Sequence, residues 1–154
     1  TMRNDRASAP AIKPRIFLVD DDAGRIEVLR NWLACTEFVL AVARSGGQAL
    51  GMLNRGGTEA IAGVFLDHDL SDSAFTDADK ALSTSNVLPL IISKIRHTVP
   101  VLIHSHNTNK AIAMQRTLHT SGFDVTRIRF ADLDPLRCIA WIDKVRENGD
   151  FAEQ

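Results

Sequence analysis

The stretch VFLDHDL at residues 64–70 places three apolar side chains directly before two carboxylates that bracket an imidazole. An apolar run that ends in this way is typical of a buried strand, and the strand must deliver its charges to water, a metal or a ligand because unpaired charge is too costly in a core. Two other stretches end similarly: IFLV at 16–19 runs into DDD at 20–22, and VLI at 101–103 runs into HSHN at 104–107. We expect the three strand ends to meet in one polar site.

The size and composition of the chain fit one globular domain. Its 154 residues are 45% apolar and 24% charged, which supplies a full core and requires no second domain. The formal net charge of -1 gives no electrostatic reason to expect duplex nucleic acid or a membrane as partner. Residues 1–13 are polar and basic, so they are neither a signal peptide nor a membrane span. We expect a flexible N-terminus over 1–13, a single domain over 14–148, a C-terminal tail over 149–154, and a cytoplasmic protein.

Apolar runs of strand length alternate with segments of helical period. The predicted strands are 15–19, 38–42, 61–66, 101–103 and 125–130, and a predicted helix follows each of them. Five such units imply an α/β three-layer sandwich, in which helices cover both faces of a five-stranded parallel sheet of flavodoxin-like order 2-1-3-4-5. Cys35 and Cys138 fall in predicted helices without metal-type spacing, so we expect two free core thiols.

In that strand order the polar strand ends lie side by side, where ligands bind in such folds. Neighbouring strands are roughly 4.8 Å apart, so their carboxylates can share a cation. We expect a divalent metal, with magnesium favoured and manganese or zinc as alternatives if histidines contribute. The expected metal ligands are Asp20, Asp21, Asp22 and Asp67. Without metal these carboxylates repel one another, so Asp67→Asn is expected to stabilise the metal-free protein.

The acidic residues at 20–22 and the aspartate at 67 resemble the acidic pair and the phosphoacceptor of response-regulator receiver domains, over roughly residues 15–146. A receiver also carries a hydroxyl residue at the end of its fourth strand and a lysine, usually before a proline, at the end of its fifth. This chain has no lysine between Lys110 and Lys144, and Asp134 precedes Pro135. The cation that holds the phosphoryl group of a receiver is therefore expected to be missing.

The pair of motifs DHDL at 67–70 and HSHN at 104–107 is similar to the cyclic-phosphate processing receiver-like family. The resemblance implies metal-dependent binding or hydrolysis of a cyclic or diester phosphate, including a cyclic nucleotide, on a receiver-like scaffold. The expected partner is thus a small phosphorylated ligand.

Hydrolysis of a phosphodiester requires neutralised phosphate oxygens, an activated water and proton transfer to the leaving oxygen. The candidate catalytic residues are Asp67, His68, His104 and His106, with His104 favoured for proton transfer because imidazole titrates near neutral pH and this one lies nearest the strand end. The candidate substrate-binding residues are Asp69, Ser105 and Asn107. Structural alternatives remain open for several of these residues. Asp22 is expected to cap a helix, and Asp21 and Asp67 could be helix caps or solvated loop acids. The three histidines could be structural: His68, His104 and His106.

Three functions follow. The first is a metal-dependent phosphoesterase that acts on a cyclic or diester phosphate. The second is a divergent receiver phosphorylated on Asp67, which the absent lysine weakens because no lasting aspartyl phosphate is then expected. The third is a pseudo-receiver that binds a nucleotide or a partner without chemistry, which the density of histidines weakens.

Overall fold

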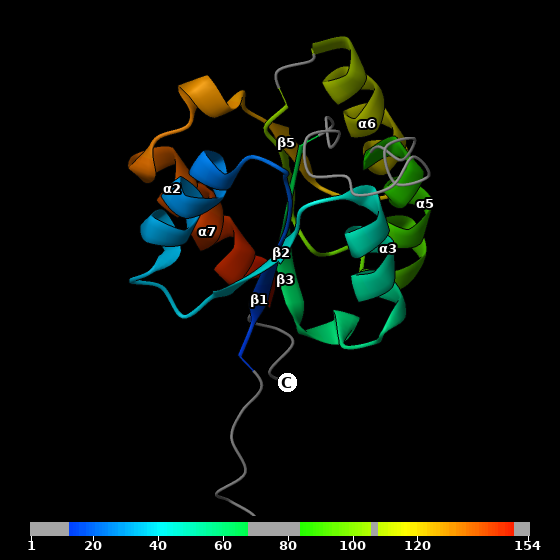
Figure 1. Cartoon of the computed structure of the whole chain (residues 1–154), viewed down its shortest axis with the longest axis horizontal. Helices are drawn as coiled ribbons and strands as arrows, with labels where there is room; N and C mark the ends of the chain where they lie inside the picture. The colour runs from blue at the N-terminus through cyan, green and yellow to red at the C-terminus, as the bar shows by residue number, and fades with distance from the viewer. Residues whose placement is uncertain (1–12, 68–83, 106–107, 150–154) are drawn as a thin grey trace, which may run out of the picture.

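The computed structural model describes residues 13–67, 84–105 and 108–149 (Figure 1). The strands are β1 Arg15–Val19, β2 Val39–Ala43, β3 Ile61–Leu66, β4 Val101–Ile103 and β5 Val125–Arg127. The helices are α2 Ala23–Leu33, α3 Gly46–Asn54, α5 Thr84–Lys94, α6 Thr108–Thr120 and α7 Pro135–Gly149, with short 3-10 helices η1 Thr58–Ala60 and η2 Phe130–Asp132. None of the helices in these ranges is long and apolar enough to span a membrane.

The sheet has the order β2-β1-β3-β4-β5, and every neighbouring pair is parallel. Helices α2 and α7 cover one face, and α3, α5 and α6 cover the other (Figure 1). The predicted three-layer sandwich and strand order are therefore confirmed. On β1, Phe17 and Val19 face the three-helix layer while Ile16 and Leu18 face α2 and α7, so both faces are buried and the strand sequence is continuously apolar.

The strand register explains why the polar residues meet. Val19 pairs with Leu66, and Leu66 pairs with Ile103, so β1, β3 and β4 end level with one another. The ladder continues one residue further, because the backbone N–H of Asp67 donates to the Val19 carbonyl at 2.9 Å and that of His104 donates to the Leu66 carbonyl at 2.9 Å. Residues 20, 67 and 104 consequently emerge at the same edge of the sheet.

One predicted strand is shorter in the structure. The alternating pattern predicts a strand to residue 130, but β5 ends at Arg127 and Phe130 begins η2. Arg129 closes this turn, because its carbonyl accepts from the Asp132 N–H at 2.9 Å and its Nε donates to Asp132 Oδ2 at 3.0 Å. Phe130 thereby turns inward and stacks on Trp32 of α2, with ring centroids 6.2 Å apart.

The cysteine prediction is half wrong. Cys138 is buried in α7, but Cys35 lies beyond the end of α2 and is exposed. The apolar stripe of α2 consists of Ile26, Leu29 and Leu33, and the helix ends at Leu33, so Cys35 does not continue that stripe into the core.

Candidate functional site

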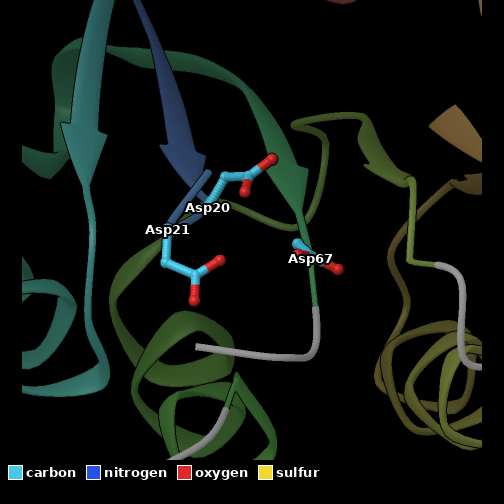
Figure 2. A group of neighbouring side chains, drawn as sticks. All are labelled: Asp20, Asp21 and Asp67. Atoms are coloured by element: carbon cyan, nitrogen blue, oxygen red, sulfur yellow. The ribbon is translucent and has the colours of Figure 1, made fainter. Parts of the chain in front are cut away.

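Three buried carboxylates converge at the carboxyl end of the sheet. Asp20 and Asp21 follow β1 and Asp67 follows β3, and one oxygen from each lies within 4.8 Å of the others (Figure 2). Asp20 is 0% exposed, Asp21 8% and Asp67 3%. Three ionised groups at this separation and burial require positive charge nearby.

Arg25 supplies part of that charge. Its Nη2 donates to Asp20 Oδ1 and to Asp67 Oδ2, both at 2.8 Å, and lies 3.8 Å from Asp21 Oδ1. Its Nε donates to Asp20 Oδ2 at 2.9 Å, so the guanidinium forms a bidentate interaction with the Asp20 carboxylate. The structure adds a contact that bears on the predicted stability of Asp67→Asn. Because Arg25 bridges Asp20 and Asp67, the substitution would lose an ion pair as well as relieve repulsion between carboxylates, so we now expect no stabilisation of the metal-free protein.

The position of Arg25 on its helix is unfavourable in itself. Asp22 is the N-cap of α2, so Arg25 occupies the first helical turn, where the helix dipole disfavours positive charge. The bonds to Asp20 and Asp67 offset this cost, and they raise the pKa of Arg25 further above its ordinary value. The ring of Phe130 lies 5.9 Å from the guanidinium carbon and limits its movement.

His104 is hydrogen-bonded to the same carboxylate of Asp20. Its Nε2 lies 2.9 Å from Asp20 Oδ2, and its side chain is 0% exposed. An ionised carboxylate only accepts hydrogen bonds, so we assign the proton to Nε2. The rings of Phe65 and Phe130 pack edge-on against the imidazole, and within the described residues Nδ1 has no hydrogen-bond partner. Burial by itself would raise the pKa of Asp20, but the hydrogen bonds from His104 and Arg25 outweigh it and hold that pKa well below the usual range.

The remaining predicted site residues fall into three groups: outside the carboxylate cluster, near a strand end, or outside the described residues. Asp22 does not join the cluster: its side chain is 49% exposed and accepts the Arg25 N–H at 2.8 Å, which makes it a helix cap. Ser105 is buried, two residues beyond the end of β4, and thus provides a hydroxyl near the strand end. His68, Asp69, His106 and Asn107 lie outside the described residues.

The donor set fits a hard divalent cation. Asp20, Asp21 and Asp67 offer only carboxylate oxygens, which magnesium prefers. With the guanidinium of Arg25 counted, the group carries a charge of about -2, which one divalent ion would cancel. The three carboxylates would therefore hold the metal, and Arg25 would lie beside it.

Arg25 was not among the residues predicted from the sequence, although its position gives a signal. Arg25 lies in the first turn of α2, three residues after the N-cap Asp22, and that turn contains no acidic residue. The helix dipole makes positive charge unfavourable at this position. Such a residue is expected to pair with a negatively charged group outside the helix, and the nearest candidates in sequence are the aspartates at 20–22.

Comparison with solved structures shows that this fold is that of receiver domains. The signal receiver domain of an HD domain-containing protein from Pseudomonas fluorescens Pf-5 matches with a TM-score of 0.66 at 16% identity, covering 96% of this chain and 97% of that one. A CheY-like response regulator receiver domain protein from Methanospirillum hungatei JF-1 matches with a TM-score of 0.65 at 16% identity, covering 89% and 97%. The receiver domain of NtrX from Brucella abortus matches with a TM-score of 0.60 at 22% identity, covering 86% and 98%.

The chain spans 28% of a longer NtrX chain from Brucella abortus, which it matches with a TM-score of 0.63 at 20% identity. No family model matches the sequence, and no curated protein is significantly similar to it. At these identities the likeness establishes the receiver fold, while the carboxylate cluster at its strand ends is a property of this chain's own structure.

Proposed function

We propose that this receiver-like domain binds a divalent cation at Asp20, Asp21 and Asp67 and accepts a phosphoryl group on Asp67. The observation that carries the proposal is the cluster of three buried carboxylates at the level ends of β1 and β3. The phosphoryl donor would be a small acyl phosphate or a phosphorylated partner protein.

The transfer is a displacement at phosphorus. A carboxylate oxygen of Asp67 forms the new P–O bond, the bond to the donor breaks, and a small donor such as acetyl phosphate leaves as acetate. Asp20, Asp21 and Asp67 would hold the divalent cation, which would supply positive charge to the phosphoryl oxygens. Arg25 holds Asp20 and Asp67 in their relative positions, and the hydrogen bond from His104 to Asp20 Oδ2 further fixes Asp20. His104 is thus assigned a positioning role here, because its buried imidazole is committed to Asp20.

Arg25 removes the main objection to phosphorylation. No lysine stands at the end of β5, so the expected cation for the phosphoryl charge is missing there, and the guanidinium at 2.8 Å from Asp67 supplies one from α2. This favours the receiver function over hydrolysis of a diester.

The test is incubation with acetyl phosphate and magnesium, followed by intact mass measurement. The proposal predicts addition of one phosphoryl group, which requires magnesium and is absent in Asp67→Asn. Asp22→Asn is the matched control, since this exposed aspartate is adjacent in sequence but outside the cluster, and it should still be phosphorylated. No mass increase in the parent protein would reject the phosphoacceptor assignment.

Metal-dependent hydrolysis of a cyclic or diester phosphate is the second candidate. It is favoured by Ser105, a buried hydroxyl beside His104, together with the DHDL and HSHN motifs. With His104 committed to Asp20, proton transfer would fall to His106 or His68. Turnover of a panel of cyclic and linear phosphodiesters with magnesium, manganese or zinc, abolished in His106→Ala without loss of metal affinity, would establish this function instead. Metal binding with neither reaction would leave a pseudo-receiver that binds a ligand or partner only.

A further inference from the structure

We infer that Arg25 binds the phosphoryl group on Asp67, and so supplies from the first turn of α2 the cation that receivers carry after their fifth strand. The inference rests on the proposed function and deepens it by assigning a residue to the phosphoryl oxygens. The contacts of Arg25 identify it for this role, since the sequence around it does not resemble that around the lysine of a receiver.

The orientation of the guanidinium shows which of its edges faces Asp67. Nε and one N–H of Nη2 face the two oxygens of Asp20, and this fork fixes the plane of the group. The second N–H of Nη2 points to Asp67 Oδ2 at 2.8 Å, and by covalent geometry it lies on the side of Nη1. The edge formed by Nη1 and Nη2 therefore faces the acceptor carboxylate.

Nη1 is the donor left for a new ligand. Within the described residues it makes no hydrogen bond, and it lies 3.9 Å from Oδ2 of the exposed Asp22. When Asp67 becomes an acyl phosphate, its negative charge moves outward onto the phosphoryl oxygens. The Nη1–Nη2 edge then meets two such oxygens in the bidentate geometry that guanidinium and phosphate favour, while the grip on Asp20 is kept.

Charge balance gives a second argument. A phosphoaspartate brings about two negative charges next to Asp20 and Asp21. With a divalent cation bound, the phosphoaspartate and the carboxylates of Asp20 and Asp21 together carry a net charge of about -2. Arg25 reduces that net charge to about -1, and without Arg25 a charge of about -2 would remain in a buried pocket. Of the arginines that follow β5, Arg129 is exposed and engaged with Asp132 at 2.9 Å.

The burial of Arg25 also suits this role. Its side chain is 18% exposed whereas that of Asp20 is fully buried, so part of the Arg25 side chain is in contact with solvent. Phe130 lies against the guanidinium, and the Asp20 carboxylate that binds it is itself fixed by His104, so the guanidinium is positioned before any ligand arrives.

The experiment compares Arg25→Gln with Arg30→Gln. Arg30 lies on the same helix in an exposed pair with Glu27, so its loss tests for general effects of removing a positive charge. Magnesium affinity is measured by calorimetry, phosphorylation by acetyl phosphate is followed by intact mass, and the lifetime of the phosphoaspartate is measured after the donor is removed. We expect Arg25→Gln to lower the rate or the lifetime by roughly 10- to 100-fold, the worth of a lost charge-assisted hydrogen bond. Its magnesium affinity should be unchanged or higher, and Arg30→Gln should match the parent.

The experiment distinguishes failure of the proposed function from failure of the Arg25 assignment. If the parent protein takes no phosphoryl group, the proposed function is wrong. If the parent is phosphorylated and Arg25→Gln equals it in rate and lifetime, Arg25 is structural and the inference is overturned. Should Arg25→Gln not fold, Arg25→Lys takes its place: it keeps the charge but loses the fork, so a shortened lifetime supports the inference and the parental lifetime refutes it.

Discussion

Replacement of Arg25 by methionine in metal-free buffer is the most informative perturbation of this pocket. Methionine keeps an unbranched side chain of similar reach but removes every contact to Asp20 and Asp67. The three carboxylates then share a buried site with only His104 beside them. Magnesium, which brings two positive charges, should replace what the arginine supplied.

The magnitude follows from burial and geometry. Breaking a buried ion pair costs about 3–5 kcal/mol, and since the Arg25 side chain is 18% exposed we take the lower end, about 3 kcal/mol. For a chain of this length that corresponds to a fall in melting temperature of roughly 6–12 °C. Magnesium at about 100 times its dissociation constant stabilises by about 2.7 kcal/mol, which brings the variant most of the way back to the stability of the parent in chelator.

The assay is thermal unfolding by circular dichroism, with a chelator and with rising magnesium. Arg25→Met should melt well below the parent in chelator. Magnesium should raise its melting temperature by more than it raises that of the parent, because no guanidinium competes for the carboxylates. Arg30→Met, which breaks only an exposed pair, should follow the parent throughout. A melting temperature of Arg25→Met within about 2 °C of the parent in chelator would refute the reasoning.

Three further predictions concern acid stability, thiol reactivity and packing. Because the pKa of Asp20 is held below its ordinary value of 3.8, its contribution to stability is complete above about pH 4 and is lost as pH falls further, so acid unfolding should be steeper in the parent than in Asp20→Asn. Burial raises the pKa of Cys138 to about 11, so iodoacetamide at about pH 8 should label only the exposed Cys35 of the native protein. Mass spectrometry would count the labels, and two labels would disprove the burial of Cys138. Gly63→Ala should lower the free energy of unfolding by about 1–3 kcal/mol in urea titrations, because its Cβ would lie 2.7 Å from Cη2 of Trp141, and an unchanged midpoint would contradict this packing.

The fold was predictable because its signals are local. Each central strand is a continuous apolar run, each is followed by a helical pattern, and such units permit few arrangements. Because parallel strands end at the same edge, the meeting of residues 20 and 67 followed from the strand order. The end of β5 was missed because Phe130 is drawn inward by Trp32 and His104, which lie elsewhere in the chain.

The interior of the site was less predictable because it depends on side-chain reach. Arg25 is charged and lies in a helix, and only its position in the first turn distinguishes it from a surface arginine. His104 belongs to a polar run that suggests exposure. However, Ile103 faces the three-helix layer, so the alternation of the strand turns His104 towards α2 and α7, where Phe130 covers it. Such a covering contact between distant segments is not encoded in either segment alone.

The central claim is that Asp67 accepts a phosphoryl group, and trapping that group tests it most directly. Borohydride reduces an aspartyl phosphate to homoserine, so the protein is treated with acetyl phosphate and magnesium, reduced, digested and sequenced by mass spectrometry. The account predicts homoserine at position 67 and nowhere else, only when magnesium was present. Homoserine at another aspartate, or none at all in protein that binds magnesium, would contradict it.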